Sequence, residues 1–327
     1  MKALRAVFDI VQPVWPAGAA WLAERLFFTP PRSKRSANGR AALARARRFT
    51  LSVDRRRVVG WRWGEPDAPV VYLVHGWASR GSRLAGFTAP LLAAGYGVVT
   101  FDGPGHGESA WGMSSIPQFA RTLAAVVGDS KPYAVIAHSM GCAAATLALS
   151  WGLEVERLAF LAPPVDPPSW IQPFARALGL RPEIVERLRA SSERRIRFRW
   201  ADLNVCDIAR RLSAHAPLLI VHDRDDETIS WDDGVAIAAA WPGAQFVSTD
   251  GLGHRGVTHN EDVVRRVVDF VVGETVRSAR YAVASGDAPN NGSPERAPSI
   301  TAHSAPRTIR NESSLLEHEL FYREERV

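Results

Sequence analysis

Residues 133–145 read Tyr-Ala-Val-Ile-Ala-His-Ser-Met-Gly-Cys-Ala-Ala-Ala, and they form the most informative turn of this 327-residue chain. An apolar run typical of a buried strand leads directly to Ser139, and an alanine-rich run typical of a helix follows it. A sharp strand-to-helix turn of this kind projects a serine hydroxyl above the edge of a sheet. The first amides of the helix have no partner within it, so they favour negative charge beside the serine. A serine that caps a helix gives the same local pattern, so the neighbouring motifs decide between the two readings.

Small residues on both sides of Ser139 agree with a tight turn. Gly141 provides the second glycine of the Gly-x-Ser-x-Gly pattern that marks a nucleophile elbow, and Ala137 occupies the position of the first glycine. The strand and the helix pass close together at such a turn, so the side chains there have to be small. Because alanine adds only one methyl group, we expect the turn to form.

The sequence on either side of this turn alternates between strand-like and helical segments. Apolar strand-like segments lie at residues 58–63, 70–74, 97–101, 133–137, 158–161, 218–221 and 245–248. Helical segments lie at residues 84–94, 116–127, 140–151, 231–240 and 261–272. Nearly continuous Val, Ile and Leu strands between helices are typical of a parallel sheet that is covered on both faces. We therefore predict an α/β fold with a mostly parallel, doubly wound sheet in residues 49–279.

Residues 163–212 interrupt this alternation. The segment begins with four prolines: Pro163, Pro164, Pro167, Pro168. The rest of it has a helical pattern and is rich in arginine. We predict a small helical cap inserted over the strand ends instead of a simple crossover. Its arginines are interleaved with glutamates, which favours a solvated helix face over an anion-binding surface. Its large aromatic side chains either pack the cap or line an apolar pocket: Trp170, Phe174, Trp200.

A second motif follows segment 70–74, where the chain reads His75-Gly76-Trp77. Together with the turn at Ser139 it resembles the α/β-hydrolase superfamily, in which a His-Gly turn after the third strand donates a backbone N–H to an oxyanion hole. The resemblance spans roughly residues 49–275 and implies the α/β-hydrolase fold. It assigns the oxyanion hole to the backbone N–H groups of Trp77 and Met140. Such donors stabilise a tetrahedral intermediate strongly because they are oriented before the charge develops.

The segment at residues 101–109, Phe-Asp-Gly-Pro-Gly-His-Gly-Glu-Ser, resembles a loop of the same superfamily that reads Asp-x-Pro-Gly-His-Gly-x-Ser. Asp102 and His106 would be suitable residue types for a catalytic pair. The loop is structural in that superfamily, however, and its glycines indicate tight turns. We expect Asp102 and His106 to shape the floor of the site.

A serine nucleophile requires a base, and the base requires a carboxylate that orients it. Segment 218–221 leads into His222-Asp223-Arg224-Asp225-Asp226, which resembles the His-Gly-x-x-Asp pattern of the superfamily and places the acid at Asp226. Asp223 stands where a glycine is usual, and Asp225 is adjacent, so both remain alternatives. Asp166, after segment 158–161, is a further candidate.

The expected base is His254, in Asp250-Gly251-Leu252-Gly253-His254 after segment 245–248. The glycines before it leave its ring free to reach across the site, whereas His215 and His259 lack this context. Ser139, Asp226 and His254 then follow the chain order Ser, acid, His that the fold requires. Each comes just after a predicted strand, at the edge where open parallel sheets bind ligands.

The resemblance implies a serine hydrolase that cleaves carboxylic or lipid-like acyl esters through an acyl-enzyme, with no cofactor and no metal. Thioesterase, amidase or peptidase activity on the same triad is the alternative, because one fold carries many reactions. A second alternative is a binding protein of the same fold without catalysis. A serine in place of an aspartate at the turn argues against dehalogenase chemistry.

The positive charge of the chain is confined to its start. Residues 1–57 contain 13 Lys and Arg against 3 Asp and Glu, whereas residues 58–279 contain 21 against 24. A nucleic-acid partner is therefore not expected. Residues 1–48 form a predicted amphipathic helical extension that either packs on the body or makes peripheral contact with a membrane. Asp9, Gln12, Pro13 and Pro16 interrupt the apolar stretch that a signal peptide would need.

Two cysteines, Cys142 and Cys206, are too few for a disulfide scaffold or a multi-cysteine zinc site. We interpret them as free thiols and expect a cytoplasmic protein, with membrane association as an option. Residues 280–327 have a composition that predicts disorder, because large apolar residues are nearly absent from 284–310.

Overall fold

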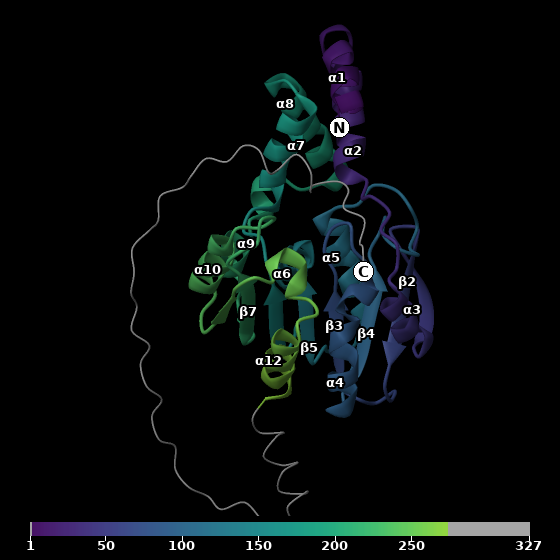
Figure 1. Cartoon of the computed structure of the whole chain (residues 1–327), viewed down its shortest axis with the longest axis vertical. Coiled ribbons are helices and arrows are strands. Elements are labelled where there is room, and N and C mark those ends of the chain that lie inside the picture. Colours follow the sequence, from purple (N-terminus) through teal and green to yellow (C-terminus); the bar gives the residue numbers. More distant parts are fainter. Residues whose placement is uncertain (1, 274–327) are drawn as a thin grey trace, which may run out of the picture. The chain divides into compact units, whose positions relative to one another are not determined.

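A single eight-stranded sheet forms the centre of the molecule, as the computed structural model shows for residues 2–273 (Figure 1). The tail predicted at 280–327 lies outside the described residues. The strands are β1 (Arg47–Val53), β2 (Arg56–Trp63), β3 (Val70–Val74), β4 (Gly97–Asp102), β5 (Ala134–His138), β6 (Arg157–Leu161), β7 (Leu218–Asp223) and β8 (Gln245–Thr249). Their order across the sheet is β1-β2-β4-β3-β5-β6-β7-β8.

The sheet is mostly parallel, as predicted. Strands β3 to β8 pair in parallel with their neighbours, and only the pairs β1–β2 and β2–β4 are antiparallel. The central strands are buried along nearly their whole length, which explains their continuous apolar sequence. The sequence pattern did not predict β1, because this edge strand is largely exposed and carries arginines.

Helices lie between the parallel strands, and one more follows β8: α4 (Thr88–Ala93), α5 (Ile116–Val127), α6 (Met140–Ser150), α10 (Trp231–Ala240) and, after β8, α12 (Glu261–Val272). One predicted helix, at residues 84–94, differs from the structure. There a 3-10 turn over Gly81–Phe87 precedes the shorter α4. Pro90 has no backbone N–H and is tolerated only in the first turn of an α-helix, so the α-helix cannot extend far back from it.

The insertion between β6 and β7 is helical, as expected for a cap. It consists of α7 (Ile171–Leu178), α8 (Pro182–Ile196) and α9 (Val205–Arg211), with 3-10 turns at Pro167–Trp170 and Trp200–Leu203. Phe174 and Trp200 are buried, and both contact the ring of Phe27 from the N-terminal helices. These two aromatic side chains pack the cap against those helices.

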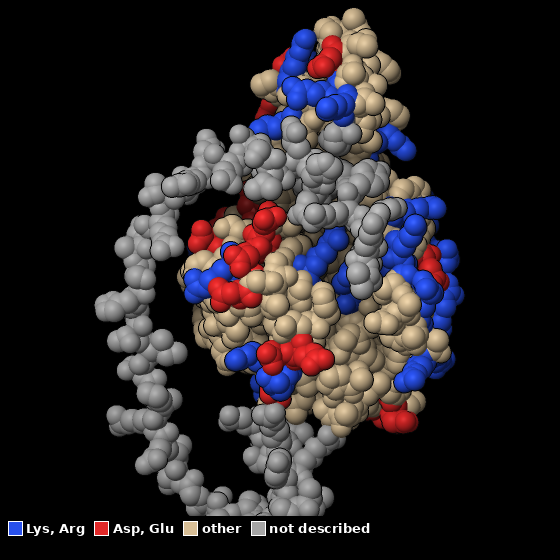
Figure 2. Space-filling view, in the orientation of Figure 1, with Lys and Arg blue, Asp and Glu red and all other residues tan. Residues whose placement is uncertain are grey.

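Three helices precede the sheet: α1 (Lys2–Val14), α2 (Pro16–Phe28) and α3 (Ala37–Ala44). Helix α1 contacts α2 and α7, and α2 packs along α8. Gln12 is almost fully buried, donating to the carbonyl of Gly179 at 3.0 Å and accepting from the amide of Arg181 at 2.7 Å. Glu24 forms an ion pair with Arg195 at 2.7 Å and accepts a hydrogen bond from Ser191. In Figure 2, uncharged side chains cover much of the end of the molecule that carries α1.

Within residues 2–273, no helix is both long enough and apolar enough to span a lipid bilayer.

Candidate active site

Ser139 lies in a strained turn between β5 and α6. Its backbone has φ 54° and ψ −126°, a conformation that L-residues adopt only where the surrounding structure enforces it. Its amide donates to the carbonyl of Leu161 on the neighbouring strand at 2.9 Å, and only 4% of its surface is exposed. A buried turn that is hydrogen-bonded to the neighbouring strand therefore holds Ser139 in this strained conformation.

Two glycines allow the chain to pass close to this serine. A Cβ atom at Gly141 would lie 2.6 Å from the carbonyl oxygen of Val74, so α6 approaches β3 more closely than any side chain permits. A Cβ atom at Gly76 would lie 2.8 Å from the Cβ of Ser139. The loop after β3 therefore packs against Ser139 and leaves no space for a side chain at Gly76.

The structure brings the three predicted site residues together. His254, on the short helix α11 (Gly253–Gly256) after β8, places its Nε2 3.0 Å from the Oγ of Ser139. Its Nδ1 lies 2.8 Å from Oδ2 of Asp226. With a proton on Nδ1, the ring donates to the carboxylate and accepts the hydroxyl proton of the serine. The arrangement has the connectivity of a nucleophile, a base and an orienting acid.

Asp226 is held as a carboxylate by four donors. Its Oδ1 accepts from the amides of Thr228 at 2.8 Å and Ile229 at 2.9 Å. Its Oδ2 faces Nε2 of His222 at 3.4 Å in addition to His254. Burial by itself raises the pKa of Asp226, but the hydrogen bonds from His222 and His254 outweigh it and hold the pKa well below its ordinary value.

The other acidic alternatives make different contacts. Asp223 accepts from the hydroxyl of Thr249 at 2.7 Å and from the amides of Leu252 at 3.1 Å and Gly253 at 2.9 Å. Asp225 accepts from the amide of Gly251 at 2.8 Å. Both carboxylates therefore anchor the loop that carries His254 and do not bond to its ring.

Asp166 likewise makes no hydrogen bond to the imidazole of His254 among residues 2–273. Of the carboxylates considered from the sequence, the structure places Asp226 alone against the base within its described part.

One predicted oxyanion amide follows the serine in the chain, and the other belongs to the loop that lies against it. Met140 is the first residue of α6, and Trp77 follows Gly76 in the loop against Ser139. Neither amide donates to another backbone group in residues 2–273. No backbone acceptor within the described residues therefore competes for either N–H group.

Two buried histidines brace the loop that contains Trp77. His75 accepts from the amide of Gly103 at 2.9 Å, and His106 accepts from the amide of Ala78 at 3.1 Å. His106 also donates to the carbonyl of Pro104 at 2.9 Å. Asp102 accepts from the amides of Gly81 and Glu108, each at 2.8 Å. Asp102 and His106 therefore support loops and make no contact of this kind with Ser139 in the described chain.

These histidines predict a loss of stability in mild acid. Burial lowers the pKa of His75 to about 4 and that of His106 to about 3. Below pH 6.5 the unfolded chain binds protons that the folded chain excludes, so the free energy of unfolding falls as the pH drops from 6.5 towards 4. His75 contributes up to about 3 kcal/mol of this change.

Urea unfolding between pH 7.5 and 4.5 measures the effect. We expect His106→Gln to reduce the pH dependence by about one proton. We expect His259→Gln, a change at an exposed histidine, to leave it unchanged. An unfolding free energy independent of pH across this range would contradict the prediction.

Sequence reasoning missed the roles of His138 and His222. His138 is buried next to the serine and places Nε2 2.9 Å from the carbonyl oxygen of His254, and the centres of the two tilted rings lie 4.7 Å apart. Burial first, and then the nearby His254, lower its pKa well below the ordinary value, so the ring is neutral and donates to that carbonyl. A histidine at the carboxyl end of an apolar strand was the available signal in both cases: His138 is the last residue of β5, and His222 is the last but one of β7.

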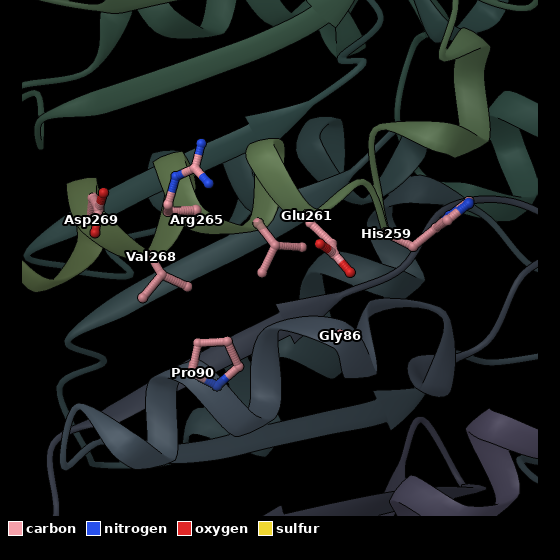
Figure 3. Close-up of a pocket in the computed structure, with 8 residues that line it drawn as sticks. Gly86, Pro90, His259, Glu261, Arg265, Val268 and Asp269 are labelled. Atoms are coloured by element: carbon pink, nitrogen blue, oxygen red, sulfur yellow. The ribbon is translucent and has the colours of Figure 1, made fainter.

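A cavity of about 520 Å³ lies elsewhere, between α4 and α12 (Figure 3). Pro90, Val264 and Val268 give it an apolar lining, with Arg265 and Glu261 at its edge. None of its lining residues is Ser139, Asp226 or His254, so it does not form the site around the serine. Among the described residues, no group of three or more His, Cys, Asp or Glu is placed to hold a metal ion.

The sheet order and the elbow define the fold of the chain, which is the α/β-hydrolase fold. Residues 64–211 match the model of a family described as serine aminopeptidase, S33. No curated protein matches the chain in sequence.

Solved structures share the fold at low sequence identity. An esterase from Pyrococcus furiosus is 20% identical, with a TM-score of 0.58 over 75% of this chain and 100% of its own. A putative lipase from Acinetobacter baumannii is 17% identical, with a TM-score of 0.55 over 76% of this chain and 100% of its own. A membrane phospholipase A, described as a bacterial virulence factor, is 18% identical, with a TM-score of 0.54 over 84% of this chain and 96% of its own.

Proposed function

We propose that the protein is a serine hydrolase that cleaves carboxylic esters through an acyl-enzyme. The observation that carries the proposal is the chain of hydrogen bonds from Ser139 through His254 to Asp226, built on a strained elbow. A serine placed only to cap a helix would need neither the positive φ nor an imidazole oriented by a carboxylate. The names of the esterase, lipase and phospholipase with the same fold support an ester substrate.

The reaction follows from the roles of these groups. His254 takes the hydroxyl proton as Oγ of Ser139 attacks the ester carbonyl, and Asp226 holds the imidazole in the required tautomer and stabilises the imidazolium. The amides of Trp77 and Met140 donate to the oxyanion of the tetrahedral intermediate. His254 then protonates the leaving alkoxide. In the second half of the reaction it activates a water molecule, which releases the carboxylic acid and restores the serine.

Amide hydrolysis is the second candidate, because the matching family is described as an aminopeptidase family. An aminopeptidase has to bind the charged amino terminus of its substrate. An acyl ester places no such demand on the site.

A fluorophosphonate probe tests the hydrolase proposal directly. We expect the wild-type protein to be labelled and Ser139→Ala to be unlabelled, because the probe reacts only with an activated serine. Ser150→Ala is the matched control, since Ser150 lies on the same helix and, within the described residues, donates only to the carbonyl of Leu147. Equal labelling of Ser139→Ala, or no labelling of the wild type, would overturn the proposal.

Relative turnover rates of esters, thioesters and anilides then identify the class of substrate. We expect turnover of nitrophenyl esters of increasing chain length to exceed turnover of the matching acyl thioesters and of aminoacyl nitroanilides. Faster turnover of the nitroanilides would favour the aminopeptidase reading.

A further inference from the structure

A cavity lined by arginines lies where α2 and α8 meet the loop that precedes α5. Its volume is about 390 Å³. Among the described residues, four arginines and no acidic residue contribute to the lining: Arg25, Arg56, Arg121, Arg195. We call it the arginine cavity.

Half of this charge is not neutralised within the described chain. Arg121 pairs with Asp54 and Arg195 pairs with Glu24, each at 2.7 Å. Arg56 donates instead to the carbonyls of Met113 at 2.7 Å and Ala110 at 2.8 Å, which carry no net charge. Arg25 lies over the ring of Trp21 and, like Arg56, has no ion pair with an acidic side chain in residues 2–273.

One donor on Arg195, a residue that lines the cavity, also has no acceptor. The Nη2 atom of Arg195 is buried and makes no hydrogen bond within the described residues. A buried guanidinium N–H without an acceptor is costly, and an anionic oxygen would satisfy it. Two unpaired guanidinium groups and an unused donor therefore favour a phosphate-like ligand.

The neighbouring helices carry an apolar surface. Of the nine large hydrophobic side chains that are exposed in the described chain, six belong to α1, α2 or the turn between them: Leu4, Val7, Ile10, Val14, Trp15, Trp21. Val14 is 77% exposed, Ile10 69% and Trp15 64%. We call these six residues the apolar N-terminal face. An exposed apolar cluster of this kind marks an interaction surface.

The apolar N-terminal face is distinct from the side of α1 that packs on the molecule. Val7, Ile10 and Val14 follow one another at intervals of three and four residues, which places them on one side of the helix. Phe8 and Gln12, spaced by four residues, are buried on another side. Packing against the cap therefore does not account for the outward apolar stripe.

The two features are joined along α2. Trp21 contacts Arg25, whose guanidinium lies 5.1 Å from the centre of its ring, and Arg25 lines the arginine cavity. Ten residues separate Trp15 from Arg25, which corresponds to about 15 Å along a helix. At the cavity itself, Arg32 lies 4.7 Å from the ring centre of the half-exposed Trp111.

We propose that this surface docks on an anionic phospholipid bilayer, with the apolar N-terminal face in the acyl region and a lipid phosphate in the arginine cavity. Tryptophan is enriched at the boundary between headgroups and acyl chains, which is the level that Trp15 and Trp21 occupy in this arrangement. The 13 basic against 3 acidic residues in residues 1–57 are complementary to anionic lipids. A second copy of the chain would bring its own unpaired arginines to the same surface, which disfavours self-association there.

The inference does not depend on the hydrolase proposal, because it concerns binding alone. Sedimentation of the full-length protein with vesicles tests it, using phosphatidylcholine alone and phosphatidylcholine mixed with phosphatidylglycerol. We expect binding to the anionic vesicles to be at least tenfold stronger than to the neutral ones and to weaken at high salt.

Two variants separate the parts of the surface. We expect Ile10→Ser with Val14→Ser to weaken binding to anionic vesicles at least tenfold, and Arg25→Gln to weaken it about fivefold. Val235→Ser and Arg210→Gln are matched controls at other exposed positions, and they should bind as the wild type does. Unchanged thermal unfolding of the variants would show that they fold.

A soluble phosphate ester, glycerol 3-phosphate, distinguishes a free ligand from a lipid headgroup. Weak, Arg25-dependent competition by this compound with vesicle binding would support the proposal. Its binding without any vesicle binding would overturn the bilayer as the partner. Equal binding to neutral and anionic vesicles, or unchanged binding of the Ile10→Ser/Val14→Ser variant, would also overturn it.

Discussion

Replacing Asp226 with asparagine is expected to lower kcat/KM for an ester substrate about 10⁴-fold, the loss that follows when the acid of a serine triad becomes an amide. Asparagine is nearly isosteric, and its oxygen retains the amides of Thr228 and Ile229 as donors. Its NH₂ group then faces Nδ1 of His254, 2.8 Å away, and favours the tautomer that has its proton on Nε2. That tautomer cannot accept the proton of Ser139.

The neighbouring aspartates provide the controls. Asp225→Asn should retain most of the activity, because within the described residues that carboxylate accepts a hydrogen bond only from the amide of Gly251. Asp223→Asn should lower the melting temperature and activity moderately, since Asp223 anchors the loop before His254. Initial rates together with thermal unfolding separate these cases. A full loss in Asp225→Asn with activity retained in Asp226→Asn would refute the assignment.

Gly141→Ala is expected to destabilise the protein and to remove most of its activity. In an ordinary helix this change adds up to about 1 kcal/mol of stability, because alanine is the better helix former. Here the new methyl group would lie 2.6 Å from the carbonyl oxygen of Val74 and 2.8 Å from that of His75. Helix α6 has to move away from β3, which displaces the Met140 amide and Ser139 together. Overpacking of this kind costs about 1–3 kcal/mol or more.

Gly86→Ala is the matched comparison, because the nearest atom to its added Cβ is 4.0 Å away. The melting temperature and the ester turnover should therefore fall in Gly141→Ala. In Gly86→Ala both should stay close to the wild-type values or rise. A stabilised, fully active Gly141→Ala variant would show that the contact between α6 and β3 is not tight.

The sheet and the proximity of Ser139, Asp226 and His254 could be predicted because their sequence signals are local. Each of Ser139, Asp226 and His254 follows an apolar strand, and parallel strands bring such positions to one edge. The choice of Asp226 over Asp223 and Asp225 rested on a family pattern. The structure gives a physical reason for this choice. Asp223 and Asp225 accept hydrogen bonds from backbone amides of the loop that they anchor.

The contacts of His138 and His222 could not be predicted, because each depends on a partner distant in sequence or on the path of a loop. His138 meets the main chain of a residue 116 positions away. The packing of Gln12 against the turn between α7 and α8 likewise joins residues 167 positions apart. A pattern of apolar residues predicts which side of a helix is buried, but it does not identify what covers that side.

Gln12 and Glu24 make the first two helices part of the architecture of the cap. The Gln12 amide satisfies the carbonyl of Gly179 and the N–H of Arg181, and Glu24 compensates the charge of Arg195. A shortened chain that begins at β1 would leave these backbone groups and a partly buried guanidinium without partners, and it would uncover Phe174 and Trp200. Point substitutions on the outer side of α1, and not deletions, are therefore the suitable tools for engineering this region.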